Sequence, residues 1–463
     1  MTHVAILGAY GSAGVAAAQT LAEDPDITLS LIDGGPPGGL CILDGCMPSK
    51  DILSAGAHRH DALTDDRLDG TLSVDIDAVV DQKTRHVTSF AEHREAAVRT
   101  LAERDSITLY ESHATFVDEG VLSVADTQLE PDYIVIATGS SVNVPDIPGI
   151  EDIDFWTSKD VLDARSFPDS GLVLGFGAIG LELVPYLATV AEMDITVIEH
   201  DDRPLDEAPP QIGQWVLDYY SDTYGVEIRT ETWEQSFSKT ADGQPSLLVE
   251  GPAGEETLKA DAVFCFTGRT PTLDGLNLDN TAIEYRDQWI DDTMQSVDDE
   301  TVFIVGDANG ERPILHNAKE EGFVAGRNIL AHSQNEPLES YDPIPHQVIF
   351  SGLGTYPFAH VGTLPQDAPD AIVSHRAATD DGVFRVKGVP EGHASLVVET
   401  NGRIIGYCGV HHHADVMAKT MQIVIERGLS VWEVPDRAFH PTTPEMLDGL
   451  LRDAADQLES SDG

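Results

Sequence analysis

The sequence is poor in basic residues and in long apolar runs. Only 27 of its 463 residues are lysine or arginine, against 80 aspartates and glutamates, so the formal net charge is −53. Because such a field repels nucleic acid and anionic membrane surfaces, neither is expected as a partner. No apolar run approaches the ~20 residues that cross a bilayer, so no membrane insertion is expected.

The acidic residues are spread through the chain rather than gathered in one tail. Their mutual repulsion would destabilise a compact fold unless dissolved ions screen it, and molar salt shortens the Debye length to ~3 Å. We therefore expect a protein of an extreme halophile. The length of 463 residues predicts more than one domain, because single cores stop growing near ~250–300 residues.

Cysteine is scarce, with four in the chain, yet Cys41 and Cys46 stand five positions apart. A structural disulfide gains most from closing a long loop, and this pair would close only a short one. The same bond would be open to exchange with a thiol. The spacing therefore favours a redox-active pair over two buried apolar cysteines. The chain begins directly with a strand, residues 3–7, which leaves no room for a secretory leader. A cytoplasmic protein is expected, and cytoplasmic disulfides are usually catalytic.

A glycine-rich turn follows the first strand and opens an alanine-rich helix. Gly11 and Gly14 fit the last part of the Gly-x-Gly-x-x-Gly pattern, whereas Gly8 stands one residue further upstream than expected. The second strand ends at Asp33, where a carboxylate can hydrogen-bond a ribose hydroxyl. The helix N-terminus offers free N–H groups to a pyrophosphate. This βαβ unit is therefore predicted to bind a dinucleotide.

A second βαβ unit carries a regular turn with Gly175, Gly177 and Gly180. Glu199 ends its next strand, where a carboxylate accepts bonds from an unphosphorylated ribose and repels a 2′-phosphate. NADH is therefore expected to be preferred over NADPH, although the nearby Arg203 leaves NADPH possible.

The cysteine segment resembles that of class I pyridine nucleotide-disulfide oxidoreductases, such as dihydrolipoamide dehydrogenase, glutathione reductase and mercuric reductase. The family carries Gly-Gly-Thr-Cys, four residues, then Cys-x-Pro-Ser-Lys; Leu40 replaces the threonine here, which indicates a side branch. His440-Pro441-Thr442-Thr443-Pro444-Glu445 is similar to the family's His-Pro-Thr-x-x-Glu. Dithiol chemistry needs a base because the thiolate is the nucleophile, and a histidine oriented by a carboxylate can exchange that proton.

The resemblance implies an α/β fold with two Rossmann-like dinucleotide-binding domains and a C-terminal α+β dimerisation domain. The expected divisions are residues 1–149 with 270–340 for FAD, 150–269 for NAD(P), and 341–463 for dimerisation. It also implies further cofactor residues, namely Thr138, Gly139, Gly306 and Asp307 toward FAD and Gly268 toward NAD(P). The family pattern weakens at residues 351–357.

The implied mechanism passes electrons from NAD(P)H through FAD to a Cys41–Cys46 disulfide. Cys46 is the sulfur nearer the flavin, and Cys41 is the interchange thiol that attacks the substrate. Lys50 resembles the family lysine beside the flavin and is paired with Glu182. His440, oriented by Glu445, would serve the active site of the other subunit, which implies an obligate homodimer with a shared active site.

The substrate class is narrowed by what the sequence shares with each branch. Mercuric reductase is disfavoured because nothing cysteine-bearing follows Cys408, and the wider family's peroxidases and oxidases use a single cysteine. Ala438-Phe439 before the histidine is more similar to glutathione reductases, whereas Glu199 and the small Ala178 resemble lipoamide enzymes.

The altered cysteine loop favours a reductase of a small disulfide, with bis-γ-glutamylcystine expected in a haloarchaeon and glutathione as a related type. Dihydrolipoamide dehydrogenase is the alternative, and a low-turnover redox-sensing flavoprotein is the second. We interpret His411-His412-His413 as a polar turn rather than a metal site, and Cys265 and Cys408 as core residues.

Overall fold

The computed structural model describes residues 1–205, 208–350 and 356–461. Of the segment 351–357, which departs from the family pattern, the first five residues lie outside this description. The chain forms two compact units. Unit 1 contains Met1–Lys50, Asp81–Asn143 and Arg269–Pro343, and unit 2 contains Asp51–Val80, Val144–Gly268 and Ile344–Gly463.

Unit 1 is built on a parallel sheet of five strands in the order β17-β7-β1-β2-β3. Its central strands are buried along most of their length, as is typical of a parallel sheet covered on both faces. The strands are β1 (Thr2–Leu7), β2 (Ile27–Ile32), β3 (Ile107–Tyr110), β7 (Tyr133–Ile136) and β17 (Val302–Ile304).

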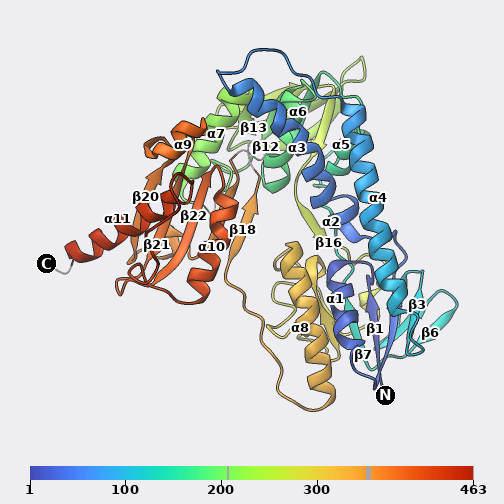
Figure 1. The fold of residues 1–463 in the computed structure, drawn as a ribbon. Coiled ribbons are helices and arrows are strands. Elements are labelled where there is room, and N and C mark those ends of the chain that lie inside the picture. The colour runs from blue at the N-terminus through green and yellow to red at the C-terminus, as the bar shows by residue number, and fades with distance from the viewer. Residues whose placement is uncertain (206–207, 351–355, 462–463) are drawn as a thin grey trace. The chain divides into compact units, whose positions relative to one another are not determined.

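Two helices of unit 1, α1 (Ser12–Leu21) and α8 (Leu315–Ser333), lie side by side, as Figure 1 shows. Small residues permit this approach: a methyl group added to Gly322 would lie 2.2 Å from the backbone oxygen of Ala13. The other helices that begin in or cross into this unit are α2 (Gly39–Leu43), α3 (Cys46–Thr64) and α4 (Ile76–Leu101).

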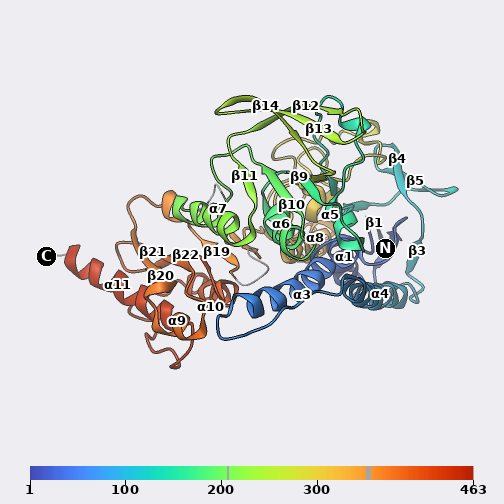
Figure 2. The ribbon, with the colours of Figure 1, turned by 90° about the horizontal axis from the view of Figure 1, so that it is seen from above.

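Unit 2 contains a second parallel sheet, with four strands in the order β11-β10-β9-β15. In Figure 2, α6 and α7 lie beside β10 and β11 of this sheet. The elements are β9 (Ser170–Leu174), α6 (Ala178–Thr189), β10 (Asp194–Ile198), α7 (Pro210–Tyr224), β11 (Glu227–Arg229) and β15 (Ala262–Cys265). A three-stranded antiparallel sheet follows β11 in the chain: β12 (Trp233–Lys239), β13 (Pro245–Gly251) and β14 (Gly254–Lys259).

The C-terminal part of unit 2 is an antiparallel sheet in the order β18-β19-β22-β21-β20, packed against two helices. The helices bury methionine and leucine side chains against the sheet. The elements are β18 (His346–Ile349), β19 (Phe358–Gly362), β20 (Ile372–Ala377), β21 (Gly392–Val398), β22 (Ile404–His411), α10 (Ala414–Glu426) and α11 (Glu445–Ser461).

The predicted fold class is confirmed: two parallel sheets flanked by helices precede a C-terminal α+β region. Within the described residues, the structure contains no helix that is long and apolar enough to cross a bilayer. The remaining elements are short and comprise β4 (Ala114–Asp118), β5 (Val121–Val124), β6 (Thr127–Leu129), β8 (Ser140–Val142), α5 (Ser158–Asp163), β16 (Arg269–Pro271) and α9 (Gly382–Lys387).

Candidate active site

The first glycine turn joins β1 to α1 and tolerates no side chain at two of its positions. Gly8 has φ +89°, and a methyl group there would lie 2.2 Å from the backbone oxygen of Ala137, the residue that follows β7. A methyl group on Gly14 would lie 2.3 Å from the oxygen of Gly8. Close packing of helix on strand therefore requires both glycines.

The second turn, between β9 and α6, repeats this arrangement. Gly175 has φ +88°, and a methyl group on Gly180 would lie 2.6 Å from its backbone oxygen. Gly11 and Gly177 both form the N-caps of the helices that follow. The first turn therefore differs from the second by one additional residue, which stands between Gly8 and Gly11; the equivalent glycines of the second turn are Gly175 and Gly177.

An acidic residue after the second strand of each βαβ unit holds the glycine turn. The Asp33 carboxylate accepts a 2.9 Å hydrogen bond from the backbone N–H of Tyr10. Glu199 accepts one of 3.0 Å from the N–H of Phe176. Burial raises the pKa of Asp33, although these backbone hydrogen bonds act in the opposite direction.

The two cysteines of the predicted redox pair lie on successive helices. Cys41 is on α2 and half-buried, whereas Cys46 begins α3 and is exposed. Both are free thiols in this structure. The pKa of Cys41 is raised, first by the hydrogen bond that its thiol donates to the Cys46 side chain and then by burial. The backbone N–H groups of Cys46 and Met47, at the start of α3, act in the opposite direction by hydrogen-bonding to the Cys41 sulfur.

A cavity of about 140 Å³ in unit 1 brings the cysteines and the first glycine turn together. Three segments that are distant in sequence meet there: the turn after β1, the cysteine segment, and the Gly306–Asn309 turn that follows β17. Its lining includes Gly11, Ser12, Ala13, Gly38, Gly39, Leu40, Cys41, Gly45, Cys46, Ala137, Gly139, Val305, Gly306, Asp307, Pro313, Leu315 and Ala318.

The polar residues around this cavity form a network that sequence reasoning only partly identified. Asp307 accepts a 2.6 Å hydrogen bond from the Ser140 hydroxyl, which in turn accepts one of 2.8 Å from Arg269 Nε. Glu321 accepts bonds of 2.7 Å from the N–H of Gly306 and 2.9 Å from Asn309 Nδ2. Burial raises the pKa of Glu321 to about 6.

The hydroxyl group of Thr138, between the lining residues Ala137 and Gly139, is buried without a hydrogen-bond partner among the described residues. A buried polar atom that lacks a partner costs about 1–3 kcal/mol, so this group fits a ligand that supplies polar atoms. The cavity volume provides room for a part of a dinucleotide.

The predicted base and its carboxylate meet in unit 2. His440 Nδ1 lies 2.9 Å from Glu445 Oε1, and the backbone N–H of Thr442 donates to the same oxygen at 3.1 Å. The hydrogen bond from His440 lowers the pKa of Glu445. The His440 side chain is 79% exposed.

The other predicted site residues lie on separate elements. Lys50 is on α3 in unit 1, whereas Glu182 is on α6 in unit 2, where its Oε1 accepts a 3.3 Å bond from the N–H of Phe350. Gly139 and Gly268 both adopt positive φ angles, of +73° and +85°. The proposed roles of Lys50, Glu182 and these two glycines stay predictions.

The histidine run and the two remaining cysteines lie away from the redox pair in sequence, and His411 and both cysteines are buried. His411 is buried at the end of β22, accepts or donates a 2.8 Å bond with the Tyr407 hydroxyl, and has its pKa lowered by burial to about 4. His413 caps α10 and lies 3.0 Å from Thr443 Oγ1. Cys265 and Cys408 are 2% and 1% exposed and belong to the core.

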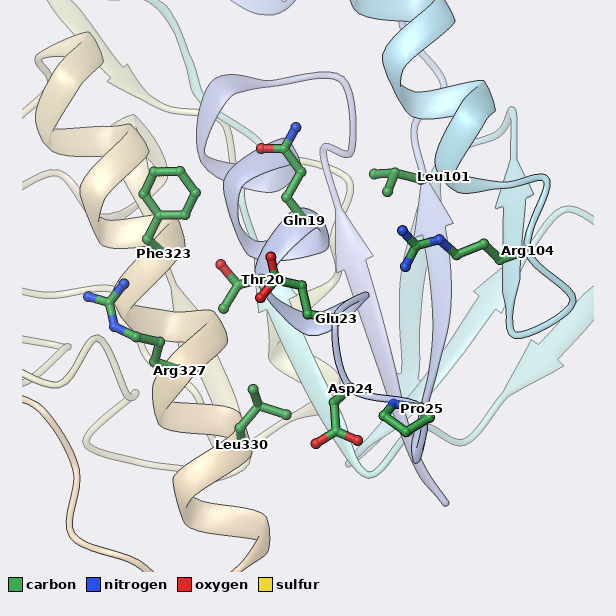
Figure 3. A pocket seen from close by; sticks show the side chains of 10 residues that line it. All are labelled: Gln19, Thr20, Glu23, Asp24, Pro25, Leu101, Arg104, Phe323, Arg327 and Leu330. Atoms are coloured by element: carbon green, nitrogen blue, oxygen red, sulfur yellow. The ribbon is translucent and has the colours of Figure 1, made fainter.

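A larger cavity of about 820 Å³ lies elsewhere in unit 1, between the C-terminal parts of α1, α4 and α8 (Figure 3). Its described lining contains neither cysteine nor a glycine of the first turn. Arg104 donates to the backbone oxygen of Ala22, and Arg327 pairs with Glu339 at 2.7 Å, so both guanidinium groups have protein partners. The larger of these two cavities is therefore not the one that the cysteines line, and cavity volume alone does not identify the active site.

Paired thiols beside a dinucleotide-binding turn, with a second such turn in the chain, define a nucleotide-dependent dithiol/disulfide oxidoreductase. The profile of the pyridine nucleotide-disulphide oxidoreductase family matches residues 2–322, and the chain belongs to that family. It is therefore an enzyme of the flavoprotein disulfide oxidoreductase class, whose members use FAD and NAD(P)H.

Curated relatives match nearly the whole chain. The dihydrolipoyl dehydrogenase of Haloferax volcanii is 27% identical over 96% of this chain and 94% of its own length. The mercuric reductase of Shigella flexneri is 28% identical over 97% of this chain and 79% of its own length. Among solved structures, the HOCl-induced flavoprotein disulfide reductase RclA from Escherichia coli superposes with a TM-score of 0.81 at 21% identity, covering 98% of this chain and 99% of that one.

Proposed function

We propose that this enzyme reduces a low-molecular-weight disulfide, of the bis-γ-glutamylcystine or glutathione type, with electrons from NAD(P)H. The observation that carries the proposal is the cavity that Cys41 and Cys46 line together with Gly11 and Asp307. The altered cysteine segment favours a small-disulfide reductase over the commoner branches of the family.

The glycine turn, Thr138 and Asp307 are proposed to hold FAD in unit 1. Gly11 begins a helix whose free N–H groups attract a pyrophosphate, and Thr138 Oγ1 is a buried hydroxyl with no partner among the described residues. FAD bound there would relay an electron pair from NAD(P)H to the cysteines. We further propose that residues 150–269 bind the nicotinamide nucleotide and that residues 341–463 form the dimerisation domain.

The cysteines then exchange with the substrate in two steps. The Cys41 thiolate attacks one substrate sulfur, forms a mixed disulfide and expels the first thiol. The Cys46 thiolate attacks the Cys41 sulfur, releases the second thiol and re-forms the Cys41–Cys46 disulfide. Cys46 therefore returns the pair to its oxidised form, ready for the next two electrons.

His440 of the partner subunit is proposed to exchange protons with the departing thiols, and Glu445 fixes its orientation. The 2.9 Å contact between the two side chains supports the orienting role, and the exposure of His440 and the neighbouring Phe439, 86% exposed, supports a role at a subunit surface. The enzyme is accordingly proposed to be a homodimer with a shared active site.

Mixing inactive variants tests the shared site. C41S and H440Q homodimers should each be inactive, but a randomised mixture should regain about a quarter of wild-type activity, because heterodimers retain one intact site. No recovery in a mixture shown to exchange subunits would contradict the shared site.

A purified-enzyme assay distinguishes the substrates. Initial rates should be measured with NADH and NADPH against bis-γ-glutamylcystine, oxidised glutathione and lipoamide, in molar salt. The proposal predicts the highest kcat/KM with one of the first two. Turnover of lipoamide alone would reverse the order and identify a dihydrolipoamide dehydrogenase, a second candidate favoured by Glu199, by Ala178 and by the relatives that carry that name. Turnover of none would favour a redox sensor.

We also infer that the protein functions in concentrated salt, because a net charge of −53 requires screening. Its melting temperature should rise steadily as potassium chloride is raised toward molar concentrations. An unchanged melting temperature between dilute buffer and molar salt would contradict this inference.

A further inference from the structure

An arginine that is distant from every motif in the sequence joins the first glycine turn to the wall of the cysteine site. Arg94, on α4, is partly buried, and its Nη1 donates a 3.0 Å hydrogen bond to the backbone oxygen of Tyr10. Its Nη2 lies 3.5 Å from Ser12 Oγ. The guanidinium thus holds the turn on both sides of Gly11.

The cysteine helix packs on the same turn. A methyl group added to Gly39, in the first position of α2, would lie 3.0 Å from Cα of Gly11 and 3.6 Å from the Tyr10 oxygen that Arg94 binds. Cys41 follows two residues later on α2, and it lines the same cavity as Ser12. The backbone turn that the guanidinium binds therefore packs against the helix that carries Cys41.

We propose that Arg94 is a positioning residue of the cysteine site, which fixes the glycine turn against α2 and whose positive charge favours the thiolate of Cys41. This inference rests on the proposed function in one respect: the proposed function makes the Cys41 thiolate the group that attacks the substrate. A cation that is partly withdrawn from water acts more strongly on its neighbour than an exposed one, because the surroundings screen it less.

The other groups that face Cys41 act in both directions. The Cys46 side chain on α3 raises the pKa of Cys41. Asp307 lines the same cavity and Asp44 lies three residues along the chain, and a carboxylate near the sulfur disfavours a second negative charge. The backbone N–H groups at the start of α3 favour the thiolate. Arg94 and Cys41 interact electrostatically, and burial lowers the pKa of Arg94.

Alkylation by iodoacetamide tests the proposal in the flavin-loaded enzyme without any disulfide turnover. The C46S background leaves Cys41 as the reactive thiol, because Cys265 and Cys408 are buried and burial raises the pKa of each to about 12. The rate is measured against pH in C46S, C46S/R94M, C46S/R94K and C46S/R85M. Arg85 is an exposed residue of the same helix, so R85M removes an equal charge from the same field.

R94M should raise the apparent pKa of Cys41 by about one unit, so alkylation below the midpoint should be about tenfold slower. R85M should leave the midpoint unchanged, and R94K should restore it because lysine keeps the charge. Equal shifts in R94M and R85M, or a shift in R94K as large as that in R94M, would overturn the proposal. Flavin absorbance and melting temperature identify an unfolded R94M. In that case R94Q, which removes the charge but keeps a hydrogen-bond donor, takes its place, and an R94Q midpoint equal to that of R94K would overturn the proposal. Failure to reduce any disulfide would leave this assay intact, so the two proposals fail separately.

Discussion

Glu199 accepts a 3.0 Å hydrogen bond from the backbone N–H of Phe176, and so joins the end of β10 to the second glycine turn. Its other oxygen accepts a 3.0 Å bond from the N–H of Asp201. The neighbouring Arg203 is bound to Asp202 by contacts of 2.7 and 2.9 Å. The carboxylate is thus held at the glycine turn where we propose that the ribose of the nucleotide binds, and Arg203, four residues further along the chain, is paired with an acid.

This arrangement predicts a preference for NADH. Wild-type kcat/KM should be at least about tenfold higher with NADH than with NADPH, because Glu199 repels a 2′-phosphate. E199Q keeps an oxygen that can accept from Phe176 but removes the charge, so the ratio should fall. E227Q, on the adjacent strand, should leave the ratio unchanged. A wild-type preference for NADPH would overturn this interpretation of Glu199.

The two glycine turns should fail independently of each other. In G14A the new methyl group would lie 2.3 Å from the Gly8 oxygen, so the purified protein should lose most of its yellow flavin colour. In G180A the corresponding distance to the Gly175 oxygen is 2.6 Å, so flavin should remain while KM for NADH rises severalfold. Flavin absorbance and initial-rate kinetics measure the two effects. Loss of flavin in G180A but not in G14A would show that the assignments of the two turns are reversed.

Substitution of His440 should separate the two half-reactions. H440Q should lower disulfide turnover by about 10²–10⁴, the usual contribution of a general acid–base. Reduction of the flavin by NADH, measured as the loss of flavin absorbance in a stopped-flow instrument, should proceed as in the wild type, since no thiol leaves in that step. H375Q, on β20 in the same unit, serves as the control. Equal losses in both half-reactions would place His440 in a structural role.

His411 should make stability depend on pH through its buried neutral ring. Burial lowers its pKa from 6.5 to about 4, so between these values the unfolded chain binds a proton that the folded protein does not. The free energy of unfolding should therefore fall by roughly 3 kcal/mol as the pH decreases through this window. H411Q should be less stable at neutral pH but should show a shallower decline. Other titrating groups change the stability of both proteins alike, so the difference between the two profiles reports His411. Parallel profiles of unfolding free energy against pH would contradict this account.

Much of the fold and part of the site could be predicted from local patterns. Glycine spacing, buried strands and a terminal acid identified both βαβ units, because these features lie within about 25 residues of one another. The extra residue between Gly8 and Gly11 made the first turn irregular in sequence, yet the structure shows the same packing as at Gly175. The cysteine pair was visible because its members are near neighbours in a chain that has few cysteines.

The remaining contacts depend on the fold and carry no local signal. Arg94 lies in an ordinary polar helix and reaches the glycine turn 84 residues earlier. Ser140 follows a predicted flavin turn and Arg269 follows a predicted nucleotide glycine, but only the antiparallel pairing of β8 and β16 brings them to Asp307. The local pattern around His413 predicts a polar turn and gives no sign of its contact with Thr443, which lies 30 positions further along the chain.

The central claim is that Cys41 and Cys46 carry electrons from bound flavin to a substrate disulfide. The most direct measurement is anaerobic titration of the purified enzyme with NADH, with free thiols counted before and after, alongside steady-state turnover of C41S, C46S and a C265S control. The wild type and C265S should gain two thiols per chain and turn over, whereas C41S and C46S should gain none and lose turnover while they keep their flavin. Undiminished turnover in either C41S or C46S would contradict the account.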